Sequence, residues 1–137
     1  MDIIQLNCGA IVYPSKVIPH PKGKVLHGIK RTDLGFLDFG EAYFSTIAPD
    51  EIKGWKKHLR MSMNLLVPVG SIRFYLETDQ GCEIEHVVLG EQDYRRLFVP
   101  PGVWVAFEGI GESMNLLMNL ANIEHDPTES VARDFTR

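Results

Sequence analysis

Residues 71–77 read Ser-Ile-Arg-Phe-Tyr-Leu-Glu, and this stretch decides the fold class. Ile72, Phe74 and Leu76 alternate with more polar residues, which is the period-2 pattern of a β-strand with one buried face. The apolar run 63–69 reaches this strand through Val-Gly-Ser at 69–71. Such a short connection between two strand-like runs predicts a β-hairpin.

Six further runs are predicted as strands, and turn residues separate them. They are residues 24–30, 41–47, 84–89, 97–99, 104–108 and 114–121. Many short strands without helical periodicity predict an all-β protein, either a sandwich or a double-sheet jelly-roll barrel. The one helix signal is Asp126-Pro127 followed by Glu129, which predicts at most one short C-terminal helix.

Length and composition predict a globular protein with a single core. The 137 residues suit one domain, residues 1–137, and the 45% apolar and 23% charged residues are ordinary for this class. The longest apolar stretches are much shorter than the roughly 18–20 residues of a membrane span, and no signal peptide opens the chain. We therefore expect a cytoplasmic protein with no membrane partner.

Charge is unevenly distributed along the chain. The net charge of −4 argues against nucleic acid as a partner, yet five basic residues fall within residues 53–60. They are Lys53, Lys56, Lys57, His58 and Arg60. The cluster predicts an anionic ligand, and a solvated turn with scattered lysines is the alternative.

Two segments resemble the paired signatures of the cupin superfamily. The first runs from residues 54–58, Gly-Trp-Lys-Lys-His, to Gly70. The second is residues 97–104, Leu-Phe-Val-Pro-Pro-Gly-Val-Trp, followed by Phe107. The resemblance implies a cupin double-sheet jelly-roll barrel with a ligand cavity at one end.

Four shorter motifs resemble one branch of that superfamily, the WxcM-like branch of dTDP-4-dehydrorhamnose 3,5-epimerases and dTDP-4-keto-6-deoxyhexose 3,4-ketoisomerases. They are residues 40–45 (Gly-Glu-Ala-Tyr-Phe-Ser), 52–55 (Ile-Lys-Gly-Trp), 100–104 (Pro-Pro-Gly-Val-Trp) and 124–129 (Glu-His-Asp-Pro-Thr-Glu). The order and spacing of the motifs carry the resemblance. It implies an isomerase or epimerase of a nucleotide-linked 4-keto-6-deoxy sugar in bacterial polysaccharide (O-antigen) synthesis.

The metal pattern of the superfamily is largely replaced. It needs His-x-His, a later Glu and a third His, and these positions hold Lys56, His58, Met63 and Val105. One imidazole, an amine, a thioether and an alkyl group cannot supply the ligands of zinc, iron or manganese. Two cysteines, Cys8 and Cys82, also lack the spacing of a zinc site or a disulfide framework. No metal and no other cofactor are expected.

The resemblance to the 3,5-epimerases implies a catalytic histidine in an Arg-Gly-Leu-His motif and a tyrosine on a later strand. Residues 53–56 read Lys-Gly-Trp-Lys instead, and Asn119 stands in place of the tyrosine. The chain also stops at Arg137, before the segment that supplies the epimerases' histidine-paired aspartate. An asparagine does not exchange protons near neutral pH, and a lysine does so only when its pKa is strongly lowered. Ordinary 3,5-epimerisation is not expected.

The 3,4-ketoisomerases are more similar, because the second histidine of their Arg-Gly-x-His-x-His motif aligns with His58. The first is again replaced by Lys56, and Leu34 stands where an arginine would help to hold the nucleotide. On a strand, residues 56 and 58 share a face while Lys57 points away. Lys56 and His58 are therefore predicted to enter the cavity, where they would bind a pyrophosphate or polarise a ketone. The alternative places Lys56 in bulk water and His58 in the packed wall.

Tyr43 is the third predicted catalytic residue, as a proton donor or a hydrogen bond to the sugar, although a packed aromatic is the alternative. Trp55 and Trp104 would stack on a base or sugar, or else pack in the core. Asn64 interrupts an apolar strand, where an unpaired amide costs about 1 to 3 kcal/mol, and is predicted to face the pocket. The predicted substrate-binding residues are Lys53, Trp55, Asn64, Arg73, Trp104 and Asn119.

Two functions from different classes follow. The first is a metal-independent isomerase or epimerase in which Lys56, His58 and Tyr43 share proton transfer and carbonyl polarisation. The second is a catalytically silent barrel that holds a sugar nucleotide or supports a partner enzyme. In either case we expect a homodimer, because a small β protein must cover its sheet edges, with residues 10–13 contributing to the interface.

Overall fold

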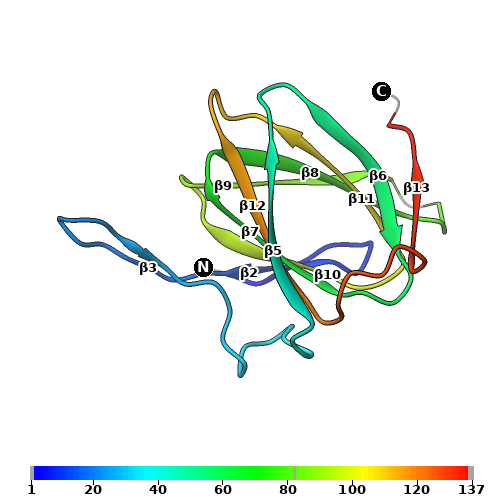
Figure 1. The fold of residues 1–137 in the computed structure, drawn as a ribbon, viewed down its shortest axis with the longest axis horizontal. Coiled ribbons are helices and arrows are strands. Elements are labelled where there is room, and N and C mark those ends of the chain that lie inside the picture. The colour runs from blue at the N-terminus through cyan, green and yellow to red at the C-terminus, as the bar shows by residue number, and fades with distance from the viewer. Residues whose placement is uncertain (1, 82, 136–137) are drawn as a thin grey trace.

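The computed structural model describes residues 2–81 and 83–135, so Cys82 lies outside the described residues. Thirteen β-strands and no helix occur in these two ranges (Figure 1). Within residues 2–81 and 83–135, no helix is long and apolar enough to cross a membrane. The all-β class predicted from the sequence is confirmed.

Two antiparallel sheets carry eleven of the strands. The six-stranded sheet has the order β1 (Ile4–Gln5), β2 (Ile11–Pro14), β10 (Arg95–Val99), β7 (Met63–Val69), β12 (Asn115–Ala121) and β5 (Glu41–Ile47). The five-stranded sheet has the order β13 (Ser130–Arg133), β6 (Ile52–His58), β11 (Val103–Gly109), β8 (Ser71–Thr78) and β9 (Glu85–Gly90). This alternation of strands between two sheets is the predicted jelly-roll architecture.

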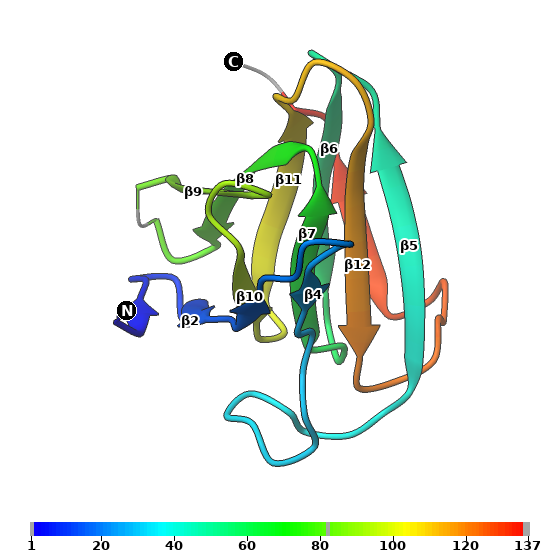
Figure 2. The same cartoon turned by 90° about the vertical axis from the view of Figure 1, so that its left-hand side faces the viewer.

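The remaining strands, β3 (Val17–Ile18) and β4 (Val25–Leu26), form a small hairpin that projects away from both sheets in Figure 1. Of the predicted strand 24–30, only Val25 and Leu26 form a strand. The connection from β4 to β5 then passes below the strand ends in Figure 2. It is fixed to the six-stranded sheet because the Asn64 Nδ2 atom donates to the Gly35 carbonyl oxygen at 3.0 Å.

Strand β8 confirms the alternation that decided the fold class. Ile72, Phe74 and Leu76 are fully buried, whereas Arg73 and Tyr75 lie on the other face and are partly exposed. The core is made by such inward residues from both sheets, for example Leu65, Leu97 and Val105. Packing of two alternating sheets therefore closes the barrel.

The predicted hairpin between residues 63–69 and 71–77 is wrong. Strands β7 and β8 belong to different sheets, and Gly70 alone connects them with a φ of 81°. A two-residue turn would let the strands pair, but one residue in the left-handed region swings the chain across the barrel. Strand β7 then pairs with β10 and β12, and β8 pairs with β9 and β11.

Of the at most one short C-terminal helix predicted, none forms within residues 126–135. The Asp126 side chain accepts hydrogen bonds from the backbone nitrogen and the hydroxyl of Thr128 at 2.9 and 2.7 Å, which closes an Asx turn. The chain continues as β13, which pairs with β6 and places Ser130 opposite His58. This pairing brings Glu129 next to His58.

Candidate functional site

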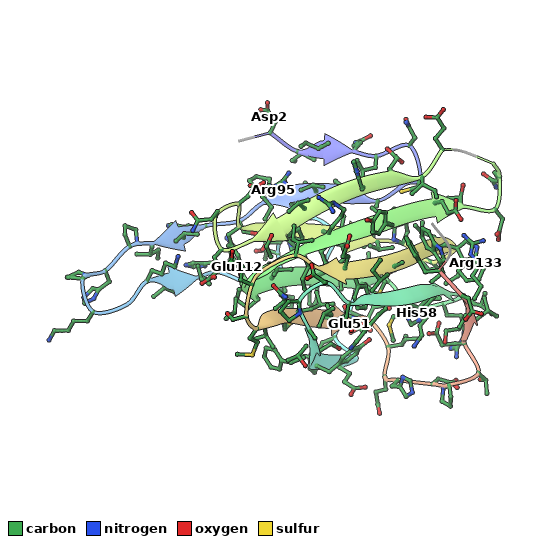
Figure 3. The ribbon with its side chains drawn as sticks, turned by 90° about the horizontal axis from the view of Figure 1, so that it is seen from above. Asp2, Glu51, His58, Arg95, Glu112 and Arg133 are labelled. Carbon is green, nitrogen blue, oxygen red and sulfur yellow. The ribbon has the colours of Figure 1, made fainter. Side chains whose placement is uncertain are left out.

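A cavity of about 220 Å³ lies between the two sheets. Twelve residues from five strands line it: Tyr43, Ser45, Lys53, Gly54, Lys56, His58, Met63, Leu65, Val105, Phe107, Leu117 and Asn119. In Figure 3 His58 and Arg133 lie toward one end of the sheets, and Arg95 and Glu112 toward the other. The polar residues of the cavity gather on β5, β6 and β12, whereas β7 and β11 supply apolar walls.

Strand β6 supplies three cationic or ionisable side chains to this cavity. Lys56 and His58 both line it, as the strand alternation predicts, and Lys57 lies outside it against Asp79. Lys53 also lines the cavity although it is three residues from Lys56, because β6 contains a β-bulge. On β6 two residues, Gly54 and Trp55, lie opposite one residue of β11. Both exposed lysines thus line the same cavity as His58.

His58 is buried and bound to a carboxylate that the sequence reasoning did not identify as functional. Its Nδ1 atom contacts Oε1 of Glu129 in a short hydrogen bond. The other oxygen, Oε2, accepts the backbone N–H groups of Arg60 and Met61, each at 3.1 Å. Glu129 is only 2% exposed, so all of its acceptor capacity is directed to these protein donors.

This arrangement fixes the charge of Glu129 and the tautomer of His58. Burial alone would raise the pKa of Glu129, but the hydrogen bonds from His58 and from the two backbone N–H groups outweigh it and hold the pKa below its usual value. An ionised Glu129 accepts the proton carried by Nδ1 of His58. In the neutral imidazole, the other ring nitrogen, Nε2, is then the one without a proton, and the His58 side chain lines the cavity.

Tyr43 supplies a second polar group to the cavity, from the six-stranded sheet opposite His58. Its hydroxyl oxygen accepts a hydrogen bond from Nδ2 of Asn119 at 2.9 Å, and its only described acceptor is the Met61 sulfur at 4.0 Å. Burial raises the pKa of Tyr43, the carboxylates of Glu41 and Glu129 add to this, and the Asn119 hydrogen bond opposes it. Tyr43 is therefore protonated at neutral pH. A thioether is a weak acceptor, so the hydroxyl proton can be given to a ligand.

Asn119 has an unused acceptor at the same place. Its Oδ1 atom is one of two buried side-chain polar atoms without a hydrogen-bond partner in residues 2–81 and 83–135. An unpaired buried carbonyl costs about 1 to 3 kcal/mol. Since Asn119 lines the cavity, a ligand hydroxyl group would satisfy this oxygen.

The four positions of the superfamily's metal pattern, Lys56, His58, Met63 and Val105, all line this cavity. The donor set does not fit a metal ion, since the imidazole is the one good ligand and its Nδ1 atom is already bound to Glu129. Within the part of the chain that the structure describes, no group of three or more His, Cys, Asp or Glu residues is placed to hold a metal.

Four predicted substrate-binding residues lie outside the cavity. Trp55 and Trp104 pack on the outer face of the five-stranded sheet, where the Arg133 guanidinium lies 5.0 and 4.3 Å from their ring centroids. Both are buried, in a cluster with Ala106 that is separate from the main core. Phe107, by contrast, lines the cavity.

Arg73 and Asn64 are the other two predicted substrate-binding residues that lie outside the cavity. Arg73 faces outward on β8 and forms an ion pair with Glu108 at 3.3 Å. Asn64 lies on the outer side of the six-stranded sheet, where its Oδ1 accepts from Arg96. The prediction that Asn64 faces the cavity is wrong, because its amide is satisfied by Arg96 and the Gly35 carbonyl instead.

Comparison with solved structures gives close matches to sugar-nucleotide enzymes, although no family model and no curated protein matches the chain. A dTDP sugar isomerase from Desulfovibrio desulfuricans G20 superposes with a TM-score of 0.87 and 34% identity, over 91% of this chain and 83% of that one. The sugar 3,4-ketoisomerase QdtA from Thermoanaerobacterium thermosaccharolyticum, solved with TDP, gives a TM-score of 0.76 and 21% identity over 89% and 86% of the two chains.

A third structure, the rmlC epimerase of Mycobacterium tuberculosis, gives a TM-score of 0.82 and 18% identity over 96% of this chain and 72% of that one. The two matches near 20% identity show a shared fold, and the isomerase at 34% identity shows the family. The resemblance carried by the sequence motifs is thereby confirmed. The chain belongs to the cupin-fold family of dTDP-sugar isomerases.

Proposed function

We propose that this protein is a metal-independent isomerase or epimerase of a nucleotide-linked 4-keto-6-deoxyhexose. The observation that carries the proposal is the His58–Glu129 pair, whose imidazole lines a cavity that also holds Lys56 and Tyr43. Enolisation next to a ketone needs a base that works near pH 7 and a donor for the developing oxyanion. These three side chains supply both.

The chemical step follows from these roles. The Nε2 atom of His58 removes the proton from the carbon next to the ketone, and the electron pair moves to the carbonyl oxygen as an enolate. The ammonium group of Lys56 and the hydroxyl of Tyr43 stabilise that oxygen. Transfer of the Tyr43 hydroxyl proton to the other face of the same carbon gives an epimer. For the isomeric ketone, the proton of the hydroxyl group on that carbon moves to the former carbonyl oxygen, and the imidazolium of His58 protonates the former carbonyl carbon. Glu129 acts as a positioning residue because it stabilises the imidazolium.

The substrate class is supported by the neighbours and by the charge at the cavity. The structure of the QdtA ketoisomerase has been solved in complex with TDP and, for a mutant, in complex with TDP-4-keto-6-deoxyglucose. Lys53 and Lys56 line the cavity from exposed positions, which suits a diphosphate. We propose a dTDP-4-keto-6-deoxyhexose as substrate, with bacterial polysaccharide (O-antigen) synthesis as the pathway that consumes the product.

Deuterium wash-in tests this function. The protein is incubated in D2O with dTDP-4-keto-6-deoxyglucose, and NMR follows the carbons next to the ketone. We expect exchange in the wild-type protein and its loss in His58→Asn. If the wild-type protein bound the sugar nucleotide but catalysed no deuterium exchange, the result would contradict the proposed isomerase or epimerase activity and support the catalytically silent barrel.

We also propose a homodimer, with a different contributor from the one predicted. Residues 10–13 do not offer a free edge, because β2 pairs with β1 on one side and with β10 on the other. The β3–β4 hairpin is the better candidate, since an isolated two-stranded hairpin is barely stable in water and Val17, Ile18 and Val25 are 39 to 52% exposed. Sedimentation at micromolar concentration should give a dimer for the wild-type protein and a monomer for Val17→Asp/Val25→Asp.

A further inference from the structure

A second basic region lies far from the barrel cavity. Residues 15–32 contain five Lys or Arg residues and no Asp or Glu, although the whole chain carries a net charge of −4. This segment forms the β3–β4 hairpin and the chain on either side of it. Concentrated charge of one sign on an acidic protein indicates a site for the opposite charge.

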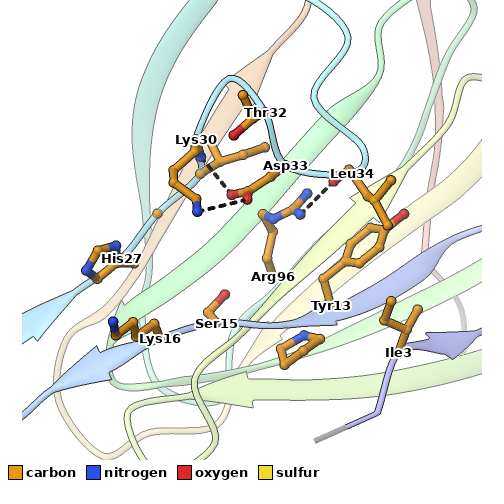
Figure 4. Close-up of a pocket in the computed structure, with 13 residues that line it drawn as sticks. Ile3, Tyr13, Ser15, Lys16, His27, Lys30, Thr32, Asp33, Leu34 and Arg96 are labelled. Atoms are coloured by element: carbon orange, nitrogen blue, oxygen red, sulfur yellow. Dashed lines mark hydrogen bonds and ion pairs between the residues drawn. The ribbon is translucent and has the colours of Figure 1, made fainter.

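The two ends of this segment meet at a cavity of about 490 Å³, shown in Figure 4. Ser15 and Lys16 line it from one side, Lys30 and Thr32 from the other, and Arg96 of β10 lies at its centre. The six-stranded sheet separates this cavity from the barrel interior. Arg96 faces outward beside Tyr13, whereas its neighbour Leu97 is buried in the core.

Arg96 is the unusual group here, since it is a guanidinium only 4% exposed. It lies over the Tyr13 ring at 4.5 Å, and its N–H groups donate to Asn64 Oδ1 and, at 2.7 Å, to the Leu34 carbonyl oxygen. These partners are neutral, and the Asp33 carboxylate is the opposite charge that acts on this buried guanidinium.

One carboxylate faces this set of cations. Asp33 accepts the backbone N–H of Lys30 at 2.7 Å and lies 3.9 Å from the Lys30 ammonium. Lys16, Lys30 and Arg96 therefore outweigh the single negative charge lining the cavity by two. The Ser15 and Thr32 hydroxyls add uncharged donors.

We infer that this outer cavity binds a phosphate dianion, either free or carried by a small molecule. A dianion matches the excess of two positive charges, and its oxygens accept the charge-assisted hydrogen bonds that lysine and arginine donate. This site is distinct from the barrel cavity, because no residue lines both cavities.

Calorimetric titration with inorganic phosphate at constant ionic strength tests the inference. We expect saturable binding to the wild-type protein and at least about tenfold weaker binding to Lys16→Met/Lys30→Met, because two charge-assisted contacts are lost. The matched control is Lys22→Met/Lys24→Met, which removes two charges from the same segment but away from the cavity, and it should bind as the wild type does. Lys56→Met, in the barrel cavity, should also bind normally.

Three results would overturn the inference: no saturable binding to the wild-type protein, equal weakening in both double variants, or loss only in Lys56→Met. The thermal midpoint of each variant checks that it is folded. A second titration with glucose 1-phosphate identifies the source of the dianion. Tighter binding than inorganic phosphate assigns the site to a phosphate ester, and equal or weaker binding assigns it to the free ion.

Discussion

Replacing Glu129 by glutamine tests the link between the buried carboxylate and the base in the cavity. The amide oxygen of the glutamine side chain would keep the backbone N–H groups of Arg60 and Met61, since an NH2 group cannot accept them. The NH2 group would then face Nδ1 of His58. That nitrogen would have to become the acceptor, and the proton would move to Nε2, where it blocks the base.

The expected loss of activity is large compared with the loss of stability. Holding a catalytic imidazole in the wrong tautomer reduces turnover by about 100- to 10,000-fold. The folded state loses one charge-assisted hydrogen bond, which costs about 1 to 2 kcal/mol. Glu129→Ala is the structural control, because it leaves two backbone N–H groups and the imidazole unpaired. At roughly 1 kcal/mol or more each, these three groups cost about 3 to 5 kcal/mol of a total stability of about 5 to 15 kcal/mol.

Deuterium wash-in measures the activity, and urea unfolding measures the stability. Glu129→Gln with wild-type exchange would refute the assigned tautomer and the role of His58 as base. The pH dependence gives a second readout. Because the pKa of Glu129 is lowered in the folded state, its stabilisation is present above the ordinary glutamate range and is lost as the pH falls through the folded value. The acid loss of stability should therefore be shallower in Glu129→Gln than in the wild-type protein.

Three further predictions concern the register, the chain crossing and the metal. Lys56→Met should weaken exchange or nucleotide-sugar binding by more than about 1.4 kcal/mol, a factor of ten, whereas Lys57→Met on the outer face should have little effect; equal effects would show that the register is wrong. Gly70→Ala should destabilise the fold by about 2 to 4 kcal/mol in urea unfolding, because a Cβ atom at residue 70 would lie 2.4 Å from the Met114 carbonyl oxygen. The control is Gly81→Ala, since residue 81 has a similar φ of 78° but no atom within 4 Å of the added Cβ; it should cost only about 1 kcal/mol of backbone strain. Elemental analysis after gentle purification should find no stoichiometric zinc, iron or manganese, and a stoichiometric metal would contradict the assigned donor set.

The strands were predictable where one face is buried and the other is not. The alternation in β8 and the inward placement of Lys56 and His58 both follow from the period of two in a strand. The pairing of β7 was not predictable in the same way, because five consecutive residues from Met63 to Val67 are buried and no face is distinguished. A strand buried on both faces lies in the middle of a sheet, but its sequence does not say which strands are its neighbours.

Lys53 shows a second limit of periodicity. Counted strictly, residue 53 lies on the opposite face from Lys56, and only the bulge opposite Ala106 returns it to the cavity. A bulge depends on the register of two strands that are far apart in the sequence. The burial of Trp55 shows the same dependence. Two residues of the C-terminal segment, Arg133 and Phe135, cover its ring.

Glu129 was missed because its local signal has two readings. An aspartate whose side chain accepts a backbone N–H two residues later begins both a helix N-cap and an Asx turn, so Asp126-Pro127 suggested a helix. The pairing of β13 with β6 decides between them, and it places Glu129 beside a histidine 71 residues away in the chain. The structure pairs the buried imidazole with a carboxylate from the turn before the last strand, and this pairing follows from the register of β13 on β6, which no local pattern in the sequence indicates.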